Sequence, residues 1–432
     1  MPELEPLSFD RALRDASREL ARRKVTGESL HDALPPQLLD EETLYWLRES
    51  RAKDPLAEHL ERWLLRLREE THFGPKRSEL GRAHREALHA ITEPEHTRLP
   101  LAEMLRLALS RPRERAAYLR GYFSSAAELG GEVRRLWEQR QIFAESLGAP
   151  LDSFEVVSAA LLPAAHTFIA ETRGAFDTLQ IHEPAQLVTH ALAESAQEGW
   201  PARLSPRTTL ELLGDPQWQH GLRLRPFLLP RALGAGSFML ALAQAGRAIS
   251  DAASALRAPF VLATDVFELR RNSVGALLGM LPLSPAYASK RLGVSPSRVR
   301  DQQRSLAHAA LVELRVGAFR VALRSLFSRG SKALDNELPE LSHAALGFEL
   351  PPSVAGVFVR VRPRDSQRFA GALLASARHE LLVQTHDEDW FRNPRAVEEL
   401  RAELSEPRST EVSAEQLAVG ARAFQTRLLA LL

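Results

Sequence analysis

The sequence predicts a mainly α-helical protein with an elongated, two-lobed architecture, a central groove and at most a small β-sheet. Apolar residues recur at three- and four-residue spacing along most of the chain, which is typical of amphipathic helices. Segments with the two-residue alternation of a β-strand are few. The chain has 432 residues, 44% of them hydrophobic, which is enough for two lobes with a buried core. We expect an N-terminal lobe over 1–205 and a C-terminal lobe over 206–432.

Capping residues and leucine spacing place the helices of the N-terminal half. Ser8 fits the N-cap of a helix over 9–24, and Asp40 or Glu41 opens a second helix that includes Trp46. Leucines recur at positions 56, 60, 64 and 67 and give one buried face to a helix over 55–70. Further helices are expected over 78–91, 99–108, 112–146 and 153–179, with proline-bearing stretches at 92–100, 200–206 and 226–230.

The C-terminal half contains the longest expected helix, over 297–328. A continuous apolar stripe runs along it, which we interpret as core, while Glu313, Arg320 and Arg324 lie on the other side. Asn393 and Pro394 form a good N-cap and first-turn pair, and Ser413 with Gln416 has the pattern of a capping box. The residues of the apolar stripe are Val312, Val316, Phe319, Leu323 and Leu326.

Three short segments carry strand signals. Residues 357–362 alternate with period two after a pair of prolines, and 260–262 and 222–224 are weaker candidates. Together they predict no more than a small sheet.

Composition excludes several classes of function. The net charge of +1 gives no overall attraction for nucleic acid or an anionic membrane. The absence of cysteine excludes disulfides, thiolate nucleophiles and cysteine-ligated metals. Arginine is abundant, at 51 residues against five lysines, which high genomic GC content would explain. The chain starts without a signal-peptide pattern and has no long apolar run, so we expect a cytoplasmic protein that does not enter membranes.

The segment Gly234–Ser254 predicts an amphipathic helix with an unusual centre. Phe238, Leu242, Ala245 and Ile249 are spaced as a buried stripe, and Arg247 is expected to pair with Asp251 across one turn. Its centre, over 243–248, has the outline of the H-E-x-G-H-A helix of one group of zinc peptidases. Alanine stands at the first histidine position (Ala243), glutamine at the glutamate (Gln244) and arginine at the second histidine (Arg247).

The order of elements over 236–327 resembles the catalytic half of the thimet oligopeptidase and oligoendopeptidase family of helical zinc peptidases. Glu268, 21 residues beyond Arg247, matches the family's third zinc ligand. The segment 138–148 is similar to the family's arginine-bearing helix that ends in a leucine-glycine turn. The resemblance implies a degenerate member that lacks the zinc-ligand histidines and the catalytic base. It therefore implies no catalytic residue, no metal and no cofactor, and a role as a peptide- or protein-binding scaffold.

A DNA-binding regulator is the first alternative. The segment 287–304 resembles a helix-turn-helix motif, with a glycine at the turn and basic residues at the start of the second helix. Lys290, Arg291, Arg298 and Arg300 would be the nucleic-acid contacts. The region 281–332 has ten basic and two acidic residues, which favours such binding locally. The polar Gln302 stands where the second helix of such a motif usually packs an apolar residue, which argues against a helix-turn-helix.

An enzyme with an unrecognised site is the second alternative. His379 and His386 lie seven residues apart before three acidic residues at 387–389, a set that suits a metal ion. His190 and Glu194 form an i, i+4 pair that would serve as metal ligands only with a second such helix. We interpret the first set as the C-terminus of a helix that runs into a solvated acidic turn, and the second as structural because no second ligand pair accompanies it. The sequence also has no phosphate loop and no nucleophile elbow.

Overall fold

The computed structural model describes residues 5–432 except 31–32, 150–158, 215, 220–221, 223, 227–228, 254–257, 265, 359–363 and 407–411. The N-terminal elements are α1 (Pro6–Thr26), α2 (Glu41–Ser50), α3 (Leu56–Glu86), β1 (Leu88–Ile91), β2 (Thr97–Pro100), α4 (Leu101–Ser110), α5 (Arg115–Ser125), α6 (Ala127–Ser146), α8 (Leu161–Glu171), α9 (Arg173–Asp177) and α10 (Pro184–Leu192). They are followed by α11 (Pro206–Leu213), α12 (Ala235–Ala253), α13 (Phe260–Ala263), α14 (Leu269–Gly279), α15 (Pro285–Lys290), α16 (Pro296–Arg329), α17 (Ser331–Leu346), α18 (Ala355–Phe358), α19 (Arg364–His386), α20 (Pro394–Ser405) and α21 (Ala414–Leu431). The prediction of a mainly α protein with a small sheet is confirmed.

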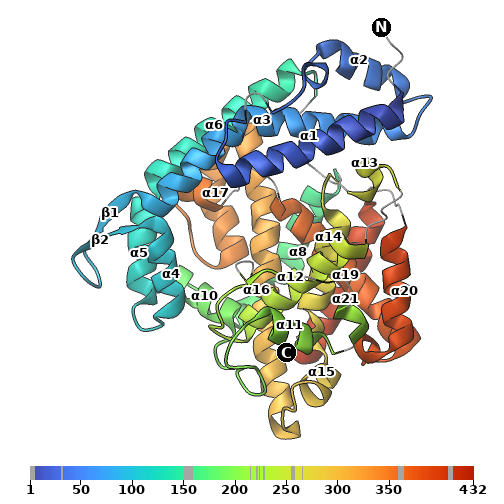
Figure 1. The fold of residues 1–432 in the computed structure, drawn as a ribbon. Coiled ribbons are helices and arrows are strands. Elements are labelled where there is room, and N and C mark those ends of the chain that lie inside the picture. The colour runs from blue at the N-terminus through green and yellow to red at the C-terminus, as the bar shows by residue number, and fades with distance from the viewer. Residues whose placement is uncertain are drawn as a thin grey trace.

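The helices form two groups around one long central helix. α1, α3 and α6 lie side by side as a layer at one end of the molecule, and α16 runs from beneath that layer through the rest of the fold (Figure 1). α16 packs against α8, α10, α17 and α19, and α14 lies between α12 and α19. The helices that enclose the central part of the molecule therefore come from both halves of the sequence.

α16 confirms the longest predicted helix. Phe319, Leu323 and Leu326 of its apolar stripe are core as expected. Val316 is half-buried, and Val312 and Val316 line a cavity.

Two charged side chains of α16 depart from the simple picture of a polar face. Arg315 is fully buried, and Arg324 is buried with its guanidinium over the ring of Trp137. Long arginine side chains pack against apolar neighbours in this way because their stems are hydrocarbon.

The predicted caps are mostly confirmed. The side chain of Asp40 accepts a hydrogen bond from the backbone of α2, and Asn393 does the same for α20. Ser413 and Gln416 form the capping box of α21. Ser8 is not an N-cap, because α1 begins at Pro6, where proline is favoured in the first turn.

The strand predictions are wrong where the structure describes them. Residues 260–262 belong to α13, because the buried carboxylate of Asp10 accepts hydrogen bonds from the backbone N–H groups of Phe260 and Val261 at 2.8 and 3.0 Å and fixes a helical start. Val357 and Phe358 lie in α18, and 359–362 fall outside the described residues. Leu222 and Leu224 are not in a strand, and residue 223 is not described.

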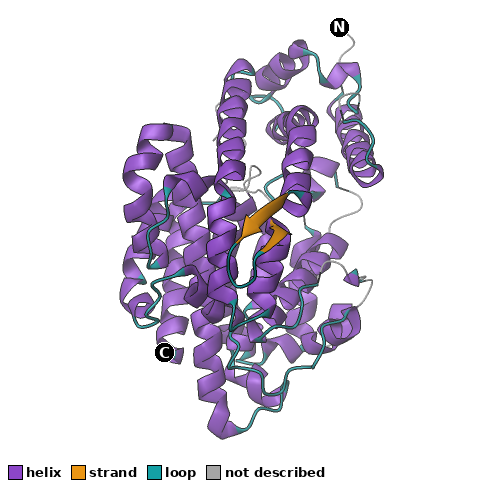
Figure 2. Cartoon of the chain, turned by 90° about the vertical axis from the view of Figure 1, so that its left-hand side faces the viewer, coloured by secondary structure: helices purple, strands orange, loops and turns teal. Residues whose placement is uncertain are grey.

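The described residues contain one antiparallel two-stranded sheet, β1 with β2 (Figure 2). β1 lies at the end of the helix predicted over 78–91, and β2 lies in the proline-bearing stretch 92–100. α3 runs through Pro75 without interruption and joins the two helices expected over 55–70 and 78–91. It ends at Glu86, and β1 begins two residues later. The helix expected over 112–146 is divided into α5 and α6 at Ala126.

One large apolar cluster holds most of the fold together. It includes Phe9 near the N-terminus, Leu428 near the C-terminus and buried residues on both sides of position 205. A smaller cluster lies around α4 and α5. Among the described residues no helix is both long and apolar enough to span a membrane. The division at residue 205 stays a prediction.

A cavity beside the central helix

A cavity of about 410 Å³ lies between α10, α12, α14, α16 and α19. Most of its walls are apolar, and four charged side chains reach it: Arg247, Glu313, Arg320 and Arg368. Of the lining residues that the structure describes, only Leu240 and Glu313 are exposed. The remaining lining residues are Leu187, Val188, Ala191, Gly236, Met239, Ala243, Asn272, Ala276, Gly279, Met280, Ala309, Ala310, Val312, Leu314, Val316, Gly317, Phe369 and Ala372.

Small residues let α12 approach α14 closely and so form one wall. A Cβ atom on Gly246 would lie 2.5 Å from the carbonyl oxygen of Val274, and one on Gly279 would lie 3.0 Å from the Cβ of Ala243. Only glycine permits backbones to pack at such distances. The same approach brings the side-chain stem of Arg247 against Gly275.

The structure brings together part of the predicted groove. Ala243 and Arg247 line the cavity, whereas Gln244 is half-buried and is not part of the lining. Glu268 precedes α14 with a positive φ of 53° and forms ion pairs with Arg66 and Arg271, each at 3.3 Å. The carboxylate that resembles a third zinc ligand is thus held by two arginines beside the cavity, outside its lining.

Arg247 does not make the ion pair that the sequence predicted. Asp251 pairs with Arg271 of α14 at 2.9 Å, because α14 packs against that end of α12. This contact between helices is not visible in the sequence pattern. In the described part of the chain Arg247 forms no hydrogen bond or ion pair, and its Nε is buried without a partner. The Arg247 side chain therefore lines the cavity without a partner among the described residues.

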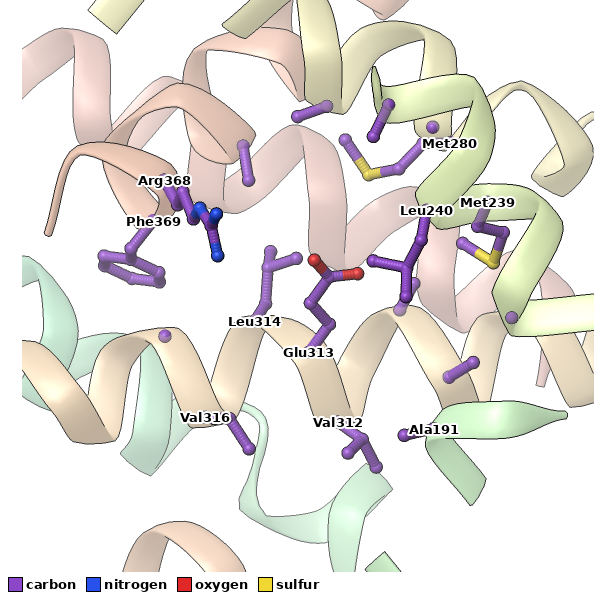
Figure 3. A pocket seen from close by; sticks show the side chains of 18 of the residues that line it. Ala191, Met239, Leu240, Met280, Val312, Glu313, Leu314, Val316, Arg368 and Phe369 are labelled. Atoms are coloured by element: carbon purple, nitrogen blue, oxygen red, sulfur yellow. The ribbon is translucent and has the colours of Figure 1, made fainter. Parts of the chain in front are cut away.

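Burial and charge set the electrostatics of this wall. Burial and, to a smaller extent, the positive charge of Arg368 lower the pKa of the Arg247 guanidinium to about 10, while the carboxylate of Glu313 opposes the shift. Figure 3 shows Arg368 and Glu313 directing their charged groups into the same space, with Leu314 between them. Two arginines therefore repel each other across an apolar cavity, with one carboxylate at the same opening.

The segment that resembles a helix-turn-helix has the expected turn but no free recognition helix. Gly293 adopts a left-handed φ of 65° between α15 and α16. Lys290 pairs with Asp389 at 2.6 Å, and Arg298 approaches Glu198 at 3.5 Å. α15 has only six residues, and α16 continues for 34 residues into the core. Arg300 stays exposed and Arg291 is half-buried.

The histidine candidates are used within the fold. His379 is buried and its Nδ1 accepts a hydrogen bond from Trp390 Nε1 at 3.2 Å. Burial lowers its pKa to about 2, so it is neutral. His386 Nε2 lies 3.0 Å from the carboxylate of Glu399. No group of three or more histidine and carboxylate side chains in the described residues is arranged to hold a metal ion.

The pair His190 and Glu194 is also separated by its contacts. The carboxylate of Glu194 pairs with Arg115 at 2.5 Å. The His190 ring meets that of His308 at 5.8 Å, and burial lowers the pKa of both imidazoles. Neither side chain of the pair is presented as a metal ligand.

The arginine-bearing helix of the resemblance is α6. It ends at Ser146, and Gly148 in the following turn has a positive φ of 62°. Arg140 is fully buried and donates to Glu69 at 2.9 Å. This arginine anchors α6 to α3 and does not line the cavity.

Sequence reasoning missed Arg368 and the whole contribution of α10 and α19. Glu313, a carboxylate in the otherwise apolar run 309–314, was recognised only as part of a polar face. We compared the chain with models of known protein families and with curated proteins, and neither comparison found a match.

Proposed function

We propose that this chain is a non-catalytic binding protein, a degenerate relative of the helical zinc peptidases, which holds a peptide or protein segment in the cavity. The observation that carries the proposal is the position of Ala243 and Arg247. These two residues line the cavity at the places where the resemblance implies zinc-ligand histidines. The two-lobed architecture with a central groove is part of the same proposal.

The chemistry of the cavity supports ligand binding and provides no site for zinc-dependent peptide hydrolysis. An alanine has no ligand atom, and a guanidinium at the second position repels a divalent cation. The volume of about 410 Å³ and the largely apolar lining lie within the range of ligand pockets. Leu240, which is 43% exposed, gives a ligand an apolar contact at the open side.

The purified protein is expected to contain no stoichiometric zinc and to show no chelator-sensitive peptidase activity. Elemental analysis and a peptide-cleavage assay with and without added zinc check this expectation. The double variant Ala243→His with Arg247→His serves as a comparison, because it restores two imidazoles one helical turn apart. Stoichiometric zinc in the unaltered protein, with cleavage that a chelator abolishes, would overturn the proposal.

Filling the cavity is expected to abolish peptide retention. Leu240→Trp adds a large ring to an exposed lining position and leaves the buried core of α12 unchanged. A peptide mixture from digestion of one defined protein is incubated with the chain, and retained peptides are identified by mass spectrometry after ultrafiltration. We expect retained, uncleaved peptides with the unaltered chain and at least a tenfold loss with Leu240→Trp.

The matched control is Leu381→Trp. Leu381 is 48% exposed on α19 and does not line the cavity, so this variant is expected to retain peptides normally. Equal retention by both tryptophan variants would place peptide binding outside the cavity. Absence of retained peptides with the unaltered chain would contradict peptide binding itself.

A further inference from the structure

We propose that the cavity selects a ligand with one carboxylate on an apolar body, and that Arg247 and Arg368 bind the carboxylate. This inference rests on the proposed function, because it names the chemistry that the same cavity recognises. The shared chemistry has two sources: the C-terminal carboxylate of a peptide that ends in an apolar residue, and a free apolar carboxylic acid.

The first argument is the state of the two guanidinium groups. Neither Arg247 nor Arg368 makes a hydrogen bond or an ion pair with the described residues, and both are half-buried at the cavity. The Nε of Arg247 is buried without an acceptor. A buried donor without an acceptor is unfavourable, and a guanidinium matches a carboxylate in a planar, bidentate arrangement. A carboxylate between the two would also relieve their mutual repulsion.

The second argument is the sign and amount of charge. Glu313 directs its carboxylate into the same space as Arg368 (Figure 3), and among the described residues that line the cavity it is the only acidic one. It opposes the entry of a second negative charge, because like charges at short range repel strongly in an apolar site. A singly charged carboxylate therefore fits better than a doubly charged phosphate. A ligand with an amino group has Glu313 as its acceptor.

The third argument is the remaining lining. Apolar side chains from three helices face the same cavity. They provide no hydrogen-bond donor or acceptor for the part of the ligand beyond its carboxylate. Burying an apolar chain against them is favourable by about 25 cal/mol per Å² of apolar surface removed from water. These side chains are Leu187 and Val188 of α10, Met239 and Leu240 of α12, and Val312 and Val316 of α16.

The test compares acids with their uncharged counterparts by isothermal titration calorimetry. The probes are a short peptide ending in leucine with a free C-terminus, the same peptide with a C-terminal amide, decanoate and decanamide. We expect the free acid of at least one pair to bind at least tenfold more tightly than its amide. Arg247→Gln and Arg368→Gln are each expected to weaken acid binding at least tenfold and to leave amide binding unchanged.

Arg300→Gln is the matched control, since Arg300 is an exposed arginine of α16 outside the cavity lining. It is expected to change no affinity. Acid binding by the peptide alone identifies a peptide C-terminus as the source, and binding by decanoate alone identifies a free carboxylic acid and overturns the peptide part of the proposed function. If acid and amide bound equally and Leu240→Trp abolished both, the carboxylate inference would be overturned and the binding cavity would stand. Binding of none of the four probes would overturn the inference as well.

Discussion

Replacing Arg315 by leucine is expected to lower the free energy of unfolding by about 4 kcal/mol or more, since about 1–3 kcal/mol is lost for each buried acceptor left unsatisfied and this side chain donates to four acceptors. Arg315 is fully buried in α16. Its Nε donates to the carbonyl of Ala345 at 3.0 Å and its Nη1 to the carbonyl of Ile169 at 2.8 Å. The same Nη1 donates to the hydroxyl of Thr172 at 2.7 Å, and Nη2 donates to the carbonyl of Ala344.

These acceptors lie at the C-terminal ends of two helices. Ile169 is in the last turn of α8, and Ala344 and Ala345 are in the last turn of α17. The last carbonyls of a helix have no partner within the helix and carry its negative dipole end. One buried guanidinium thus satisfies both ends and fastens them to α16. Burial lowers its pKa to about 10, so it remains charged at neutral pH.

Urea unfolding followed by circular dichroism measures the effect. Arg315→Lys is expected to be intermediate, because an ammonium keeps the charge but cannot bridge the same set of acceptors. Arg329→Leu is the control, since Arg329 of the same helix forms an exposed ion pair with Glu337 and such pairs contribute little. Arg315→Leu with the stability of the unaltered chain would show that the two helix ends are satisfied in another way.

The sequence was sufficient for features that depend on neighbouring residues. The extent of α16 and the caps at Asp40, Asn393 and Ser413 were predicted correctly, because periodicity and capping are local properties. Residues 260–262 were predicted incorrectly, because the group that makes them helical is Asp10, about 250 residues away in the chain. A short apolar run does not by itself distinguish strand from helix.

The candidate site was predictable only at α12. The pattern over 243–248 indicated a helix without zinc ligands, and Ala243 and Arg247 do line the cavity. The sequence could not show that Arg247 lacks the expected ion pair with Asp251, because Asp251 pairs instead with Arg271 of α14. Arg368 carries no signal in its own segment. Its role follows only from the packing of α19 beside α14 and α16.

Gly246→Ala is expected to lower the free energy of unfolding by about 1–3 kcal/mol, the usual cost of overpacking a well-packed contact. The added Cβ would lie 2.5 Å from the carbonyl oxygen of Val274 and 2.9 Å from the Cα of Gly275. Both are backbone atoms, so no side chain can rotate away, and α12 must separate from α14. Alanine is a better helix former than glycine by about 1 kcal/mol, so the expected loss is the net result of the two effects.

Gly131→Ala is the matched control, because Gly131 lies within α6 and an added Cβ there meets nothing within 4 Å. It is expected to leave the stability unchanged or to raise it by up to about 1 kcal/mol. Gly246→Ala is also expected to weaken ligand binding, because α14 contributes Asn272, Ala276, Gly279 and Met280 to the cavity. Urea unfolding and calorimetry with the carboxylate probes measure the two effects separately. If Gly246→Ala matched Gly131→Ala in both measurements, the close approach of α12 and α14 would not be what shapes the cavity, and the position of Arg247 would need another cause.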